Sequence, residues 1–241
     1  MAQPPNGAIL AGGLGTRLRP AVADSAKVVA PVAGRPFLQF LLEQLRTAGV
    51  RQVVLCTGYQ ARQVERQIGS QFKDLEILYS AENEPLGTGG ALRQAWQRIG
   101  DSASTGWIVM NGDSFCDIDL ARFWREHERS GLSATLAAVE VTDGSRYGTV
   151  SWDSSGRLME FGEKQAGGGR WINAGIYGFG LEFLDTLANG SWSSPLSLER
   201  DVLPRWIPRG IHVFDQSARF IDIGTPDSYR AAQEFFGGAA G

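Results

Sequence analysis

The sequence predicts an α/β fold in which a mostly parallel sheet is covered by helices on both faces. In the first half of the chain, short apolar segments alternate with amphipathic segments of helical spacing, an order typical of parallel sheets. The apolar segments are continuous, as expected when helices bury both faces of each strand. Glycine-rich or polar loops follow several of these segments, at the edge where such sheets bind ligands.

The first half of the chain begins with the apolar segment Ala8–Ala11, which we expect to be a buried strand. A helix is expected after Pro36, because leucines recur at helical spacing until Gly49 ends the pattern. The alternation then continues. The expected elements are a strand Val53–Cys56, a helix from Gln60 to about Ser70, a strand Leu75–Tyr79, a helix from about Gly90 to Ile99 and a strand Trp107–Met110.

Beyond Ser130 the segments are shorter and glycine-rich turns join them. We interpret residues 131–236 as an extension of the same sheet that carries a second substrate. Residues 1–241 would then form a single domain, with a first half over 1–130 and a short tail over 237–241. The expected strands are Ala134–Val141, Gly148–Trp152, Leu158–Gly162, Trp171–Phe179, Ile211–Phe214 and Phe220–Ile223, and the expected helices are Leu181–Leu187, Leu198–Arg205 and Pro226–Phe236.

The composition argues against several classes of function. The formal net charge is −3, whereas nucleic-acid-binding domains are usually basic. The N-terminus lacks a charged leader and no apolar run approaches the roughly 18 residues of a membrane span, so we expect a cytoplasmic protein without a membrane partner. Cys56 and Cys116 lie in apolar segments, and the only histidines are His127 and His212. A zinc site is therefore not expected.

The loop after the first strand has the composition of a phosphate-binding site. Three glycines between residues 12 and 15 allow a tight turn that brings backbone N–H groups to an anion, and Arg17 and Lys27 follow. The loop is not a Walker motif, because no lysine follows the glycines at that spacing, and Leu18 replaces the third glycine of a dinucleotide fingerprint. A tight turn without a ligand and a nicotinamide-dependent dehydrogenase remain alternatives.

Two aspartates are candidates to bind Mg²⁺. Asp113 follows a strongly apolar strand at the rim of the sheet, where a helix or turn cap is the alternative. Asp222 lies within an apolar strand, and burying a carboxylate is costly unless it is paired or bound to a metal. Mg²⁺ takes few protein oxygens and leaves the other positions to phosphates and water. The aspartates and the glycine loop together indicate phosphoryl or nucleotidyl transfer.

Three further polar residues follow or lie within predicted elements. Lys164 comes just after a strand, although exposed lysines are usually only solvating. Asn173 lies in an apolar strand and must find hydrogen bonds from the backbone or from a ligand. Glu199 is explained equally well by an ordinary capped helix.

The segment Leu10–Pro20, with Lys27 and Pro31–Pro36, resembles the signature of the sugar-1-phosphate nucleotidylyltransferases, and the resemblance covers nearly the whole chain. Within this family, Ser197–Asp201 and Phe220–Pro226 look most like D-glycero-α-D-manno-heptose 1-phosphate guanylyltransferases. Six further motifs match in order: Glu84–Gly90, Asn111–Asp113, Arg146–Gly148, Glu163–Lys164, Asn173–Gly175 and Asp222–Pro226. The resemblance implies a Rossmann-like three-layer sandwich with a mostly parallel mixed sheet, the glycosyltransferase-A-like nucleotidyltransferase fold.

The resemblance also implies a reaction and its residues. A sugar 1-phosphate oxygen would attack the α-phosphorus of a nucleoside triphosphate, giving pyrophosphate and a nucleotide sugar for surface glycan synthesis. Catalysis would come from in-line positioning and charge neutralisation. The implied roles are catalysis by Arg17, Lys27 and Asp113; Mg²⁺ binding by Asp113 and Asp222; nucleotide binding by Leu10, Ala11, Gly12, Gly13, Gly15, Thr16, Glu84, Gly87, Thr88 and Gly112; and sugar-phosphate binding by Gly148, Glu163, Lys164, Asn173 and Glu199.

GTP is the expected nucleotide. Guanine presents adjacent N1–H and N2–H donors that one carboxylate accepts side by side, and Glu84 precedes the loop at a predicted strand end. Mannose-1-phosphate guanylyl transfer, uridylyl or thymidylyl transfer to another sugar 1-phosphate, and a non-catalytic nucleotide-sugar sensor are the alternatives. A homo-oligomer is compatible with the sequence. One departure from the family is Ala26, where many relatives have proline before the signature lysine.

Overall fold

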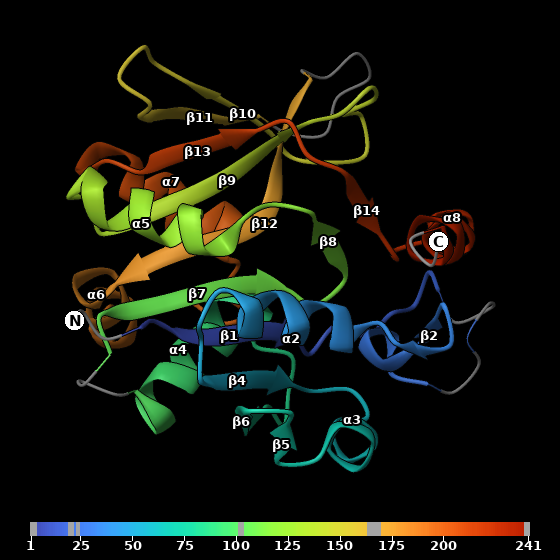
Figure 1. The fold of residues 1–241 in the computed structure, drawn as a ribbon. Coiled ribbons are helices and arrows are strands. Elements are labelled where there is room, and N and C mark those ends of the chain that lie inside the picture. Colours follow the sequence, from blue (N-terminus) through green and yellow to red (C-terminus); the bar gives the residue numbers. More distant parts are fainter. Residues whose placement is uncertain (1–3, 19–21, 23–24, 101–103, 163–169, 239–241) are drawn as a thin grey trace.

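The computed structural model describes residues 4–18, 22, 25–100, 104–162 and 170–238, and its main feature is a ten-stranded mixed sheet (Figure 1). The sheet contains β1 (Asn6–Ala11), β4 (Gln52–Thr57), β5 (Gln71–Phe72), β6 (Leu75–Ala81), β7 (Gly106–Asn111), β9 (Ala134–Glu140), β10 (Thr149–Trp152), β11 (Leu158–Gly162), β12 (Trp171–Gly180) and β13 (His212–Gln216). Their order is β11-β10-β12-β7-β1-β4-β6-β5, and β9 and β13 continue from β12. Strands β7, β1, β4 and β6 are parallel, whereas β12 is antiparallel to β7.

Alternate residues of the central strands pack into two separate hydrophobic clusters, so the sheet is the middle of three layers. In β1, Ile9 belongs to one cluster and Ala8 to the other, and in β7 Ile108 and Trp107 divide in the same way. The face of Ile9 is covered by α2 (Leu38–Thr47), α3 (Ala61–Ile68), α5 (Leu120–Ser130) and α8 (Pro226–Gly237). The opposite face is covered by α4 (Gly87–Ile99), α6 (Leu181–Asn189) and α7 (Leu203–Trp206).

The predicted fold class is confirmed, because helices cover both faces of a mixed sheet with a parallel centre. Helix α5 was not predicted, although Asp119 caps its first turn and its buried residues follow helical spacing. Helix α4 begins at Gly87 rather than near Gly90. The N–H groups of Gly89 and Gly90 donate to the carbonyl of Leu196, which supports a glycine-rich first turn that local propensity disfavours.

The N-terminal part of the predicted helix Leu198–Arg205 is also different, because it forms a π-helical turn η2 (Leu198–Val202) before α7. Short elements complete the chain: the 3₁₀ turns η1 (Lys27–Val29) and η3 (Ile207–Arg209), and the strands β2 (Pro31–Val32) and β3 (Arg35–Pro36). None of the helices in the described ranges has the length and apolar character needed to cross a membrane.

From the sequence we expected the strand at Phe220–Ile223 to extend the main sheet. The observed strand β14 (Phe220–Asp222) lies outside that sheet. It pairs with β8 (Ser114–Cys116) in a separate antiparallel ribbon, with Asp222 opposite Ser114. The N–H of Ile223 donates to the carbonyl of Asp113 and extends this pairing. The ribbon therefore brings the two predicted metal ligands side by side, although they are more than a hundred positions apart in the chain.

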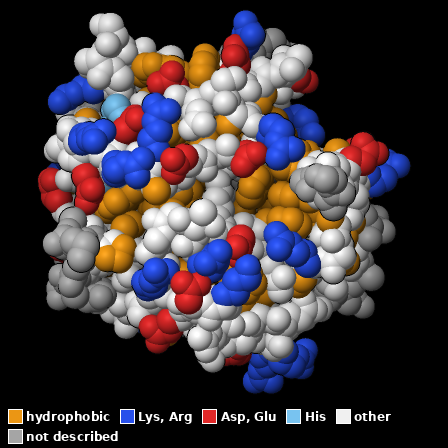
Figure 2. Space-filling model, viewed as in Figure 1, with side chains coloured by type: hydrophobic (Ala, Val, Ile, Leu, Met, Phe, Trp, Pro, Cys, Tyr) orange, Lys and Arg blue, Asp and Glu red, His pale blue; other side chains and the backbone are white. Residues whose placement is uncertain are grey.

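Helix α8 is anchored by a capping box of Thr225 and Ser228 and by aromatic contacts. The ring of Phe236 stacks on Phe40 of α2 and meets Phe115 of β8 edge-on. Figure 2 shows hydrophobic surface next to this end of the chain, interspersed with Lys and Arg side chains. Because α8 directly follows β14, these contacts also fix the turn that carries Asp222 and its neighbours.

Candidate active site

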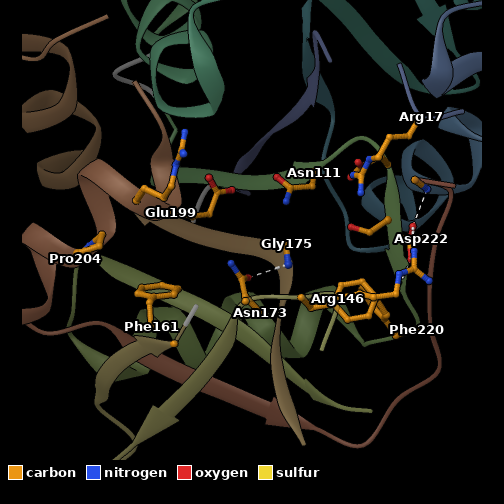
Figure 3. A pocket seen from close by; sticks show the side chains of 17 residues that line it. Arg17, Asn111, Arg146, Phe161, Asn173, Gly175, Glu199, Pro204, Phe220 and Asp222 are labelled. Carbon is orange, nitrogen blue, oxygen red and sulfur yellow. Dashed lines mark hydrogen bonds and ion pairs between the residues drawn. The ribbon is translucent and has the colours of Figure 1, made fainter. Parts of the chain in front are cut away.

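Two adjoining cavities lie at the carboxyl edge of the parallel strands. The larger has a volume of about 820 Å³ and the smaller about 420 Å³. The smaller is lined by the glycine loop after β1 and by the start of α4. The larger is lined mainly by residues of the second half, from β11, β12 and η2 among others (Figure 3). Parallel α/β sheets bind ligands at this edge. The volumes of the two cavities suit small molecules.

Four residues line both cavities: Arg17, Asn111, Asp113 and Gly224. They come from the loop after β1, from the end of β7 and its following turn, and from the turn after β14. A group bound in one cavity therefore lies beside a group bound in the other. We call these residues the shared wall.

An ion pair stands at the shared wall. The Nζ atom of Lys27 lies 2.7 Å from Oδ2 of Asp113, and the side chains of the two residues are 10% and 48% exposed, respectively. The loop backbone packs on the lysine stem at Gly15, whose φ is +58° and where a Cβ would lie 3.2 Å from Lys27 Cβ. The glycine loop and the signature lysine thus form one packed unit.

Gly224 lets three charged groups approach one another. A Cβ at this position would lie 2.7 Å from Oδ1 of Asp222. It would also lie 3.6 Å from Nζ of Lys27 and 3.8 Å from Nη2 of Arg17. Two cations and the second aspartate therefore meet at the shared wall, where an anionic ligand would find positive charge from both sides of the turn.

The Asp222 carboxylate is 8% exposed and fully hydrogen-bonded. Its Oδ2 accepts from the Tyr147 hydroxyl at 2.5 Å and from the Arg146 guanidinium at 3.2 Å. Its Oδ1 accepts from the Gly224 N–H at 2.6 Å and from the Ser228 hydroxyl at 3.0 Å. Burial alone would raise the pKa of Asp222, but these donors, Tyr147 first, outweigh burial and lower the pKa below its ordinary value.

A polar network connects the two cavities away from the shared wall. Glu199 of the larger cavity accepts a hydrogen bond from the hydroxyl of Thr88, which lines the smaller cavity, at 2.8 Å. The other oxygen of Glu199 accepts from the Tyr177 hydroxyl at 3.2 Å. Asn173 donates to that hydroxyl at 2.8 Å and accepts from the N–H of Gly175 at 2.9 Å. The alternative explanation of Glu199 as a simple helix residue therefore misses its main contacts.

The glycine loop also packs against a carboxylate of the smaller cavity. A Cβ on Gly12 would lie 2.6 Å from Oε1 of Glu82, and Oε2 of Glu82 accepts from the N–H of Leu86 at 3.1 Å. Burial raises the pKa of Glu82. Glu82 lines the cavity, whereas Glu84 is exposed.

The cavities gather most of the predicted site residues. Ala11, Glu84 and Gly112 line neither cavity in the described part of the chain, although the N–H of Gly112 bonds the carbonyl of Leu10 at 3.0 Å. Glu163 and Lys164 lie outside the described residues. The smaller cavity is lined by Leu10, Gly12, Gly13, Gly15, Thr16, Arg17, Lys27, Gly87, Thr88 and Asp113, and the larger by Arg17, Asp113, Gly148, Asn173, Glu199 and Asp222.

Sequence reasoning missed several residues of the site. Asn111, Arg146 and Tyr147 lay inside the matched motifs, but we assigned them no role. Figure 3 shows Asn111 directed into the larger cavity, and its buried Oδ1 accepts no hydrogen bond within the described residues. An unpaired buried acceptor is costly, so a ligand donor would stabilise it. No sequence signal distinguished Glu82 from Glu84, which differ only in their position relative to the strand end.

A family model described as nucleotidyl transferase matches residues 6–237. The D-glycero-alpha-D-manno-heptose 1-phosphate guanylyltransferase of Aneurinibacillus thermoaerophilus is 36% identical over 227 residues, which are 94% of this chain and 96% of that protein. The catalytic subunit beta of the mannose-1-phosphate guanylyltransferase of Drosophila melanogaster is also 36% identical, over 225 residues. These residues are 92% of this chain but only 60% of that longer protein.

Solved structures agree with these sequence relatives. The crystal structure of HddC from Yersinia pseudotuberculosis complexed with GMP-PN has a TM-score of 0.80 and 33% identity, covering 96% of this chain and 99% of that chain. A crystal structure from Bacillus anthracis, provisionally named a glucose-1-phosphate thymidylyltransferase, has a TM-score of 0.84 and 22% identity. The match covers 95% of this chain and 94% of that chain. At that identity, the second likeness supports the fold alone.

Proposed function

The chain belongs to the nucleotidyl transferase family, and from that premise we propose that it transfers GMP from GTP to a sugar 1-phosphate. The favoured acceptor is D-glycero-α-D-manno-heptose 1-phosphate. A phosphate oxygen of the acceptor forms a bond to the α-phosphorus of GTP, and the bond from that phosphorus to the bridging oxygen of pyrophosphate breaks. The products are GDP-heptose and pyrophosphate.

The observation that carries this proposal is the shared wall between two cavities of different character. GTP would lie in the smaller cavity, against the glycine loop, and the sugar phosphate in the larger. Their reacting phosphates would then meet at Arg17 and Asp113, which line both cavities. Holding the two reactants side by side supplies much of the rate enhancement that such a reaction needs.

Positive charge at the wall fits the charge that the reaction concentrates there. Arg17 and Lys27 approach Gly224 from different segments, and Lys27 is held in place by Asp113. We infer that Arg17 and Lys27 bind the phosphates of the nucleotide and stabilise the negative charge that develops on the transferring group.

The aspartates provide oxygen ligands of the kind that Mg²⁺ prefers. One oxygen of the half-exposed Asp113 is bonded to Lys27, and we infer that its other oxygen binds the ion. Asp222 would first have to exchange its contact with Arg146, since both of its oxygens already accept hydrogen bonds. With that exchange the pair fits the ion, which when bound would neutralise phosphate charge.

The guanine base would be recognised by Glu82, two residues before the glutamate that the sequence favoured. Glu82 lies in the lining of the smaller cavity beside Gly12, whereas Glu84 is exposed. A carboxylate can accept from N1–H and N2–H of guanine together, and uracil offers only one such donor at that edge. A wrong base would leave a partly buried carboxylate unpaired.

Two motifs favour the heptose acceptor, because Ser197–Asp201 and Phe220–Pro226 look most like those of D-glycero-α-D-manno-heptose 1-phosphate guanylyltransferases. The relatives named for that acceptor, from Aneurinibacillus thermoaerophilus and Campylobacter jejuni, are 36% and 34% identical to this chain. The mannose-1-phosphate enzymes of Drosophila melanogaster and Mycobacterium tuberculosis are 36% and 33% identical. Mannose 1-phosphate is the second candidate acceptor, because the identities of 36% and 33% are comparable. Cytoplasmic location and a role in surface glycan synthesis stay predictions.

Pyrophosphate release tests the proposal. The purified protein would be assayed with Mg²⁺ and each of GTP, UTP, ATP and dTTP against heptose, mannose and glucose 1-phosphates. We expect the highest kcat/KM with GTP and the heptose. A preference for mannose 1-phosphate would select the second candidate, and a preference for UTP or dTTP would contradict guanylyl transfer. Omitting Mg²⁺ in the presence of a chelator should abolish release.

A further inference from the structure

The phenol of Tyr177 is buried beneath the larger cavity. Tyr177 lies in β12 with 0% exposure, and its ring stacks on Phe179 with centroids 5.6 Å apart. A buried tyrosine hydroxyl normally needs hydrogen-bond partners. Its partners here are side chains that line the cavity, although Tyr177 itself is not among the lining residues described for it.

The partners of the Tyr177 hydroxyl determine which hydrogen bond it donates and which it accepts. Glu199 can only accept, so the phenolic proton points to Oε1 of Glu199 at 3.2 Å. The oxygen of the phenol then accepts from Nδ2 of Asn173 at 2.8 Å. The side chain of Asn111 also interacts with this hydroxyl. One oxygen atom therefore contacts three side chains that face the sugar-phosphate cavity.

This arrangement determines which atoms remain for a ligand. Asn173 directs Nδ2 toward Tyr177 and Oδ1 toward the N–H of Gly175, so its amide cannot turn over without losing both bonds. Glu199 is held on both oxygens, by Tyr177 on one and by Thr88 on the other. Oε2 of Glu199 also accepts from the Ser197 hydroxyl at 3.2 Å, so a lone pair on Oε1 of Glu199 and the second N–H of Asn173 are the groups left to meet sugar hydroxyls.

We propose that Tyr177 is a positioning residue for sugar-phosphate binding, which orients Asn173 and Glu199 through its hydroxyl without touching the substrate. The inference rests on the proposed function, because it takes the larger cavity as the site of the sugar 1-phosphate. The buried ring of Tyr177 packs in the hydrophobic core, and a phenylalanine at this position would pack there equally well. The hydroxyl is the part that serves the site.

The test is Tyr177→Phe, which keeps the ring and removes only the hydroxyl. We expect the KM for the sugar 1-phosphate to rise by roughly tenfold, because two ligand-binding side chains lose their fixed orientation. The KM for GTP should change by less than about twofold, since Asn173 and Glu199 do not line the smaller cavity and Asn111 is the one partner of Tyr177 that does. A purely structural role would instead lower the melting temperature and leave the KM values of the folded enzyme unchanged.

Tyr79→Phe is the matched control. The hydroxyl of Tyr79 donates to the carbonyl of Gly69 at 2.6 Å, and Tyr79 lines neither cavity in the described residues. Losing that hydroxyl should leave both KM values unchanged. Calorimetric titration with GTP, without the acceptor, checks that each variant is folded.

Four results would decide the matter. A selective rise in the sugar-phosphate KM of Tyr177→Phe supports the inference. An unchanged sugar-phosphate KM, or equal rises for both substrates, overturns it. A Tyr177→Phe protein that no longer binds GTP also overturns it, because the hydroxyl would then maintain the fold rather than orient two side chains. Wild-type protein that binds GTP but turns over no sugar 1-phosphate would contradict the proposed function itself.

Discussion

Two half-exposed aspartates of this protein form ion pairs in different surroundings. Asp113 pairs with Lys27 at the shared wall, with 48% of its side chain exposed. Asp117 pairs with Arg219 at 3.0 Å, with 49% of its side chain exposed. The aspartates are almost equally exposed, but the Lys27 side chain is 10% exposed and the Arg219 side chain 61%, so loss of the first pair should cost more stability than loss of the second. Only Asp113 faces both cavities, so only its substitution should affect catalysis.

We predict that Asp113→Asn lowers kcat by roughly a hundredfold or more, because the substitution removes a carboxylate that we propose binds Mg²⁺ and releases the partner of Lys27. Asp117→Asn should leave kcat near the wild-type value. Asp117→Asn should melt within a few degrees of the wild type, whereas Asp113→Asn should fold but melt at a lower temperature, because Lys27 loses its partner. Steady-state kinetics in saturating Mg²⁺ gives the answer, and near-normal turnover of Asp113→Asn would remove this residue from the catalytic machinery.

The two glutamates beside α4 give a second pair of matched variants. Glu82→Gln should reduce the preference for GTP over UTP by roughly tenfold to a hundredfold, because one paired acceptor for guanine becomes a donor. Glu84→Gln should leave the preference unchanged, since Glu84 is exposed. Measuring kcat/KM for both triphosphates with each variant decides between them. The opposite pattern would restore the sequence-based choice of Glu84.

Individual residues could be predicted from the sequence where the chemistry restricts the residue type. The glycine loop, Lys27 and both aspartates line the cavities, as the glycines, the following lysine and the carboxylates beside apolar segments led us to expect. Glu82 and Tyr177 were not identified, because a glutamate at the end of a strand and a tyrosine inside one are ordinary. Their roles depend on side chains that only the fold brings near, such as Gly12 and Glu199.

The segment before Lys27 shows how one element supports another. Ala26 has φ −60° and ψ 130°, and its N–H donates to Oε1 of Gln63 in α3 at 2.7 Å. A proline at this position would fix the same φ but would have no N–H to donate. Gln63 therefore restrains the backbone at Ala26 by a hydrogen bond, where proline would restrain it through its ring. This hydrogen bond holds the segment of the signature lysine in place.

We predict that Gln63→Ala raises the KM for GTP several-fold, because the Lys27 segment loses its tether and leaves a buried N–H unpaired. In an Ala26→Pro background the same substitution should have little further effect. Kinetics of the two single variants and the double variant test this. Equal effects of Gln63→Ala in both backgrounds would show that Gln63 acts elsewhere.

Helix α5 is joined to β9 by a buried histidine. His127 is 5% exposed, and its Nδ1 lies 2.8 Å from Oγ1 of Thr135. Burial, and secondarily the charge of His212, lowers the pKa of His127 to about 4. Between that value and the ordinary pKa of about 6.5, the unfolded chain binds the proton and the folded chain does not.

The free energy of unfolding should therefore be fully retained above pH 6.5 and should decrease as the pH falls toward 4, by up to about 1.4 kcal/mol per pH unit. Urea unfolding at pH 7 and pH 5 measures the loss. His127→Gln should be less stable at pH 7, and its stability should depend less on pH. An identical pH dependence in both proteins would assign the acid sensitivity to other groups, such as His212.

The elements of the first half were the easiest to predict, because apolar runs and helical spacing there agree with the parallel sheet. The ribbon of β8 and β14 was not predictable. Its strands have three residues each, too few to show a periodic pattern, and they pair across a long stretch of sequence. Helix α5 was also not predicted, although its buried residues follow helical spacing.

Considered as a whole, the molecule places two cavities on one continuous sheet. The smaller belongs to the parallel strands of the first half, and the larger to the antiparallel additions around β12. Because β12 pairs directly with β7, the strand that ends in Asn111 belongs to both. The sequence predicted this continuity and the carboxyl-edge position of the loops, but not which residues would separate the cavities.

Transfer between two cavities requires both substrates and yields both products together. Phosphorus NMR of wild-type protein with Mg²⁺, GTP and D-glycero-α-D-manno-heptose 1-phosphate follows all four species at once. We predict that pyrophosphate and GDP-heptose appear in equal amounts, at equal rates, and that neither forms when the heptose phosphate is omitted. Pyrophosphate released without an acceptor, or no product with any sugar 1-phosphate, would contradict nucleotidyl transfer across the shared wall.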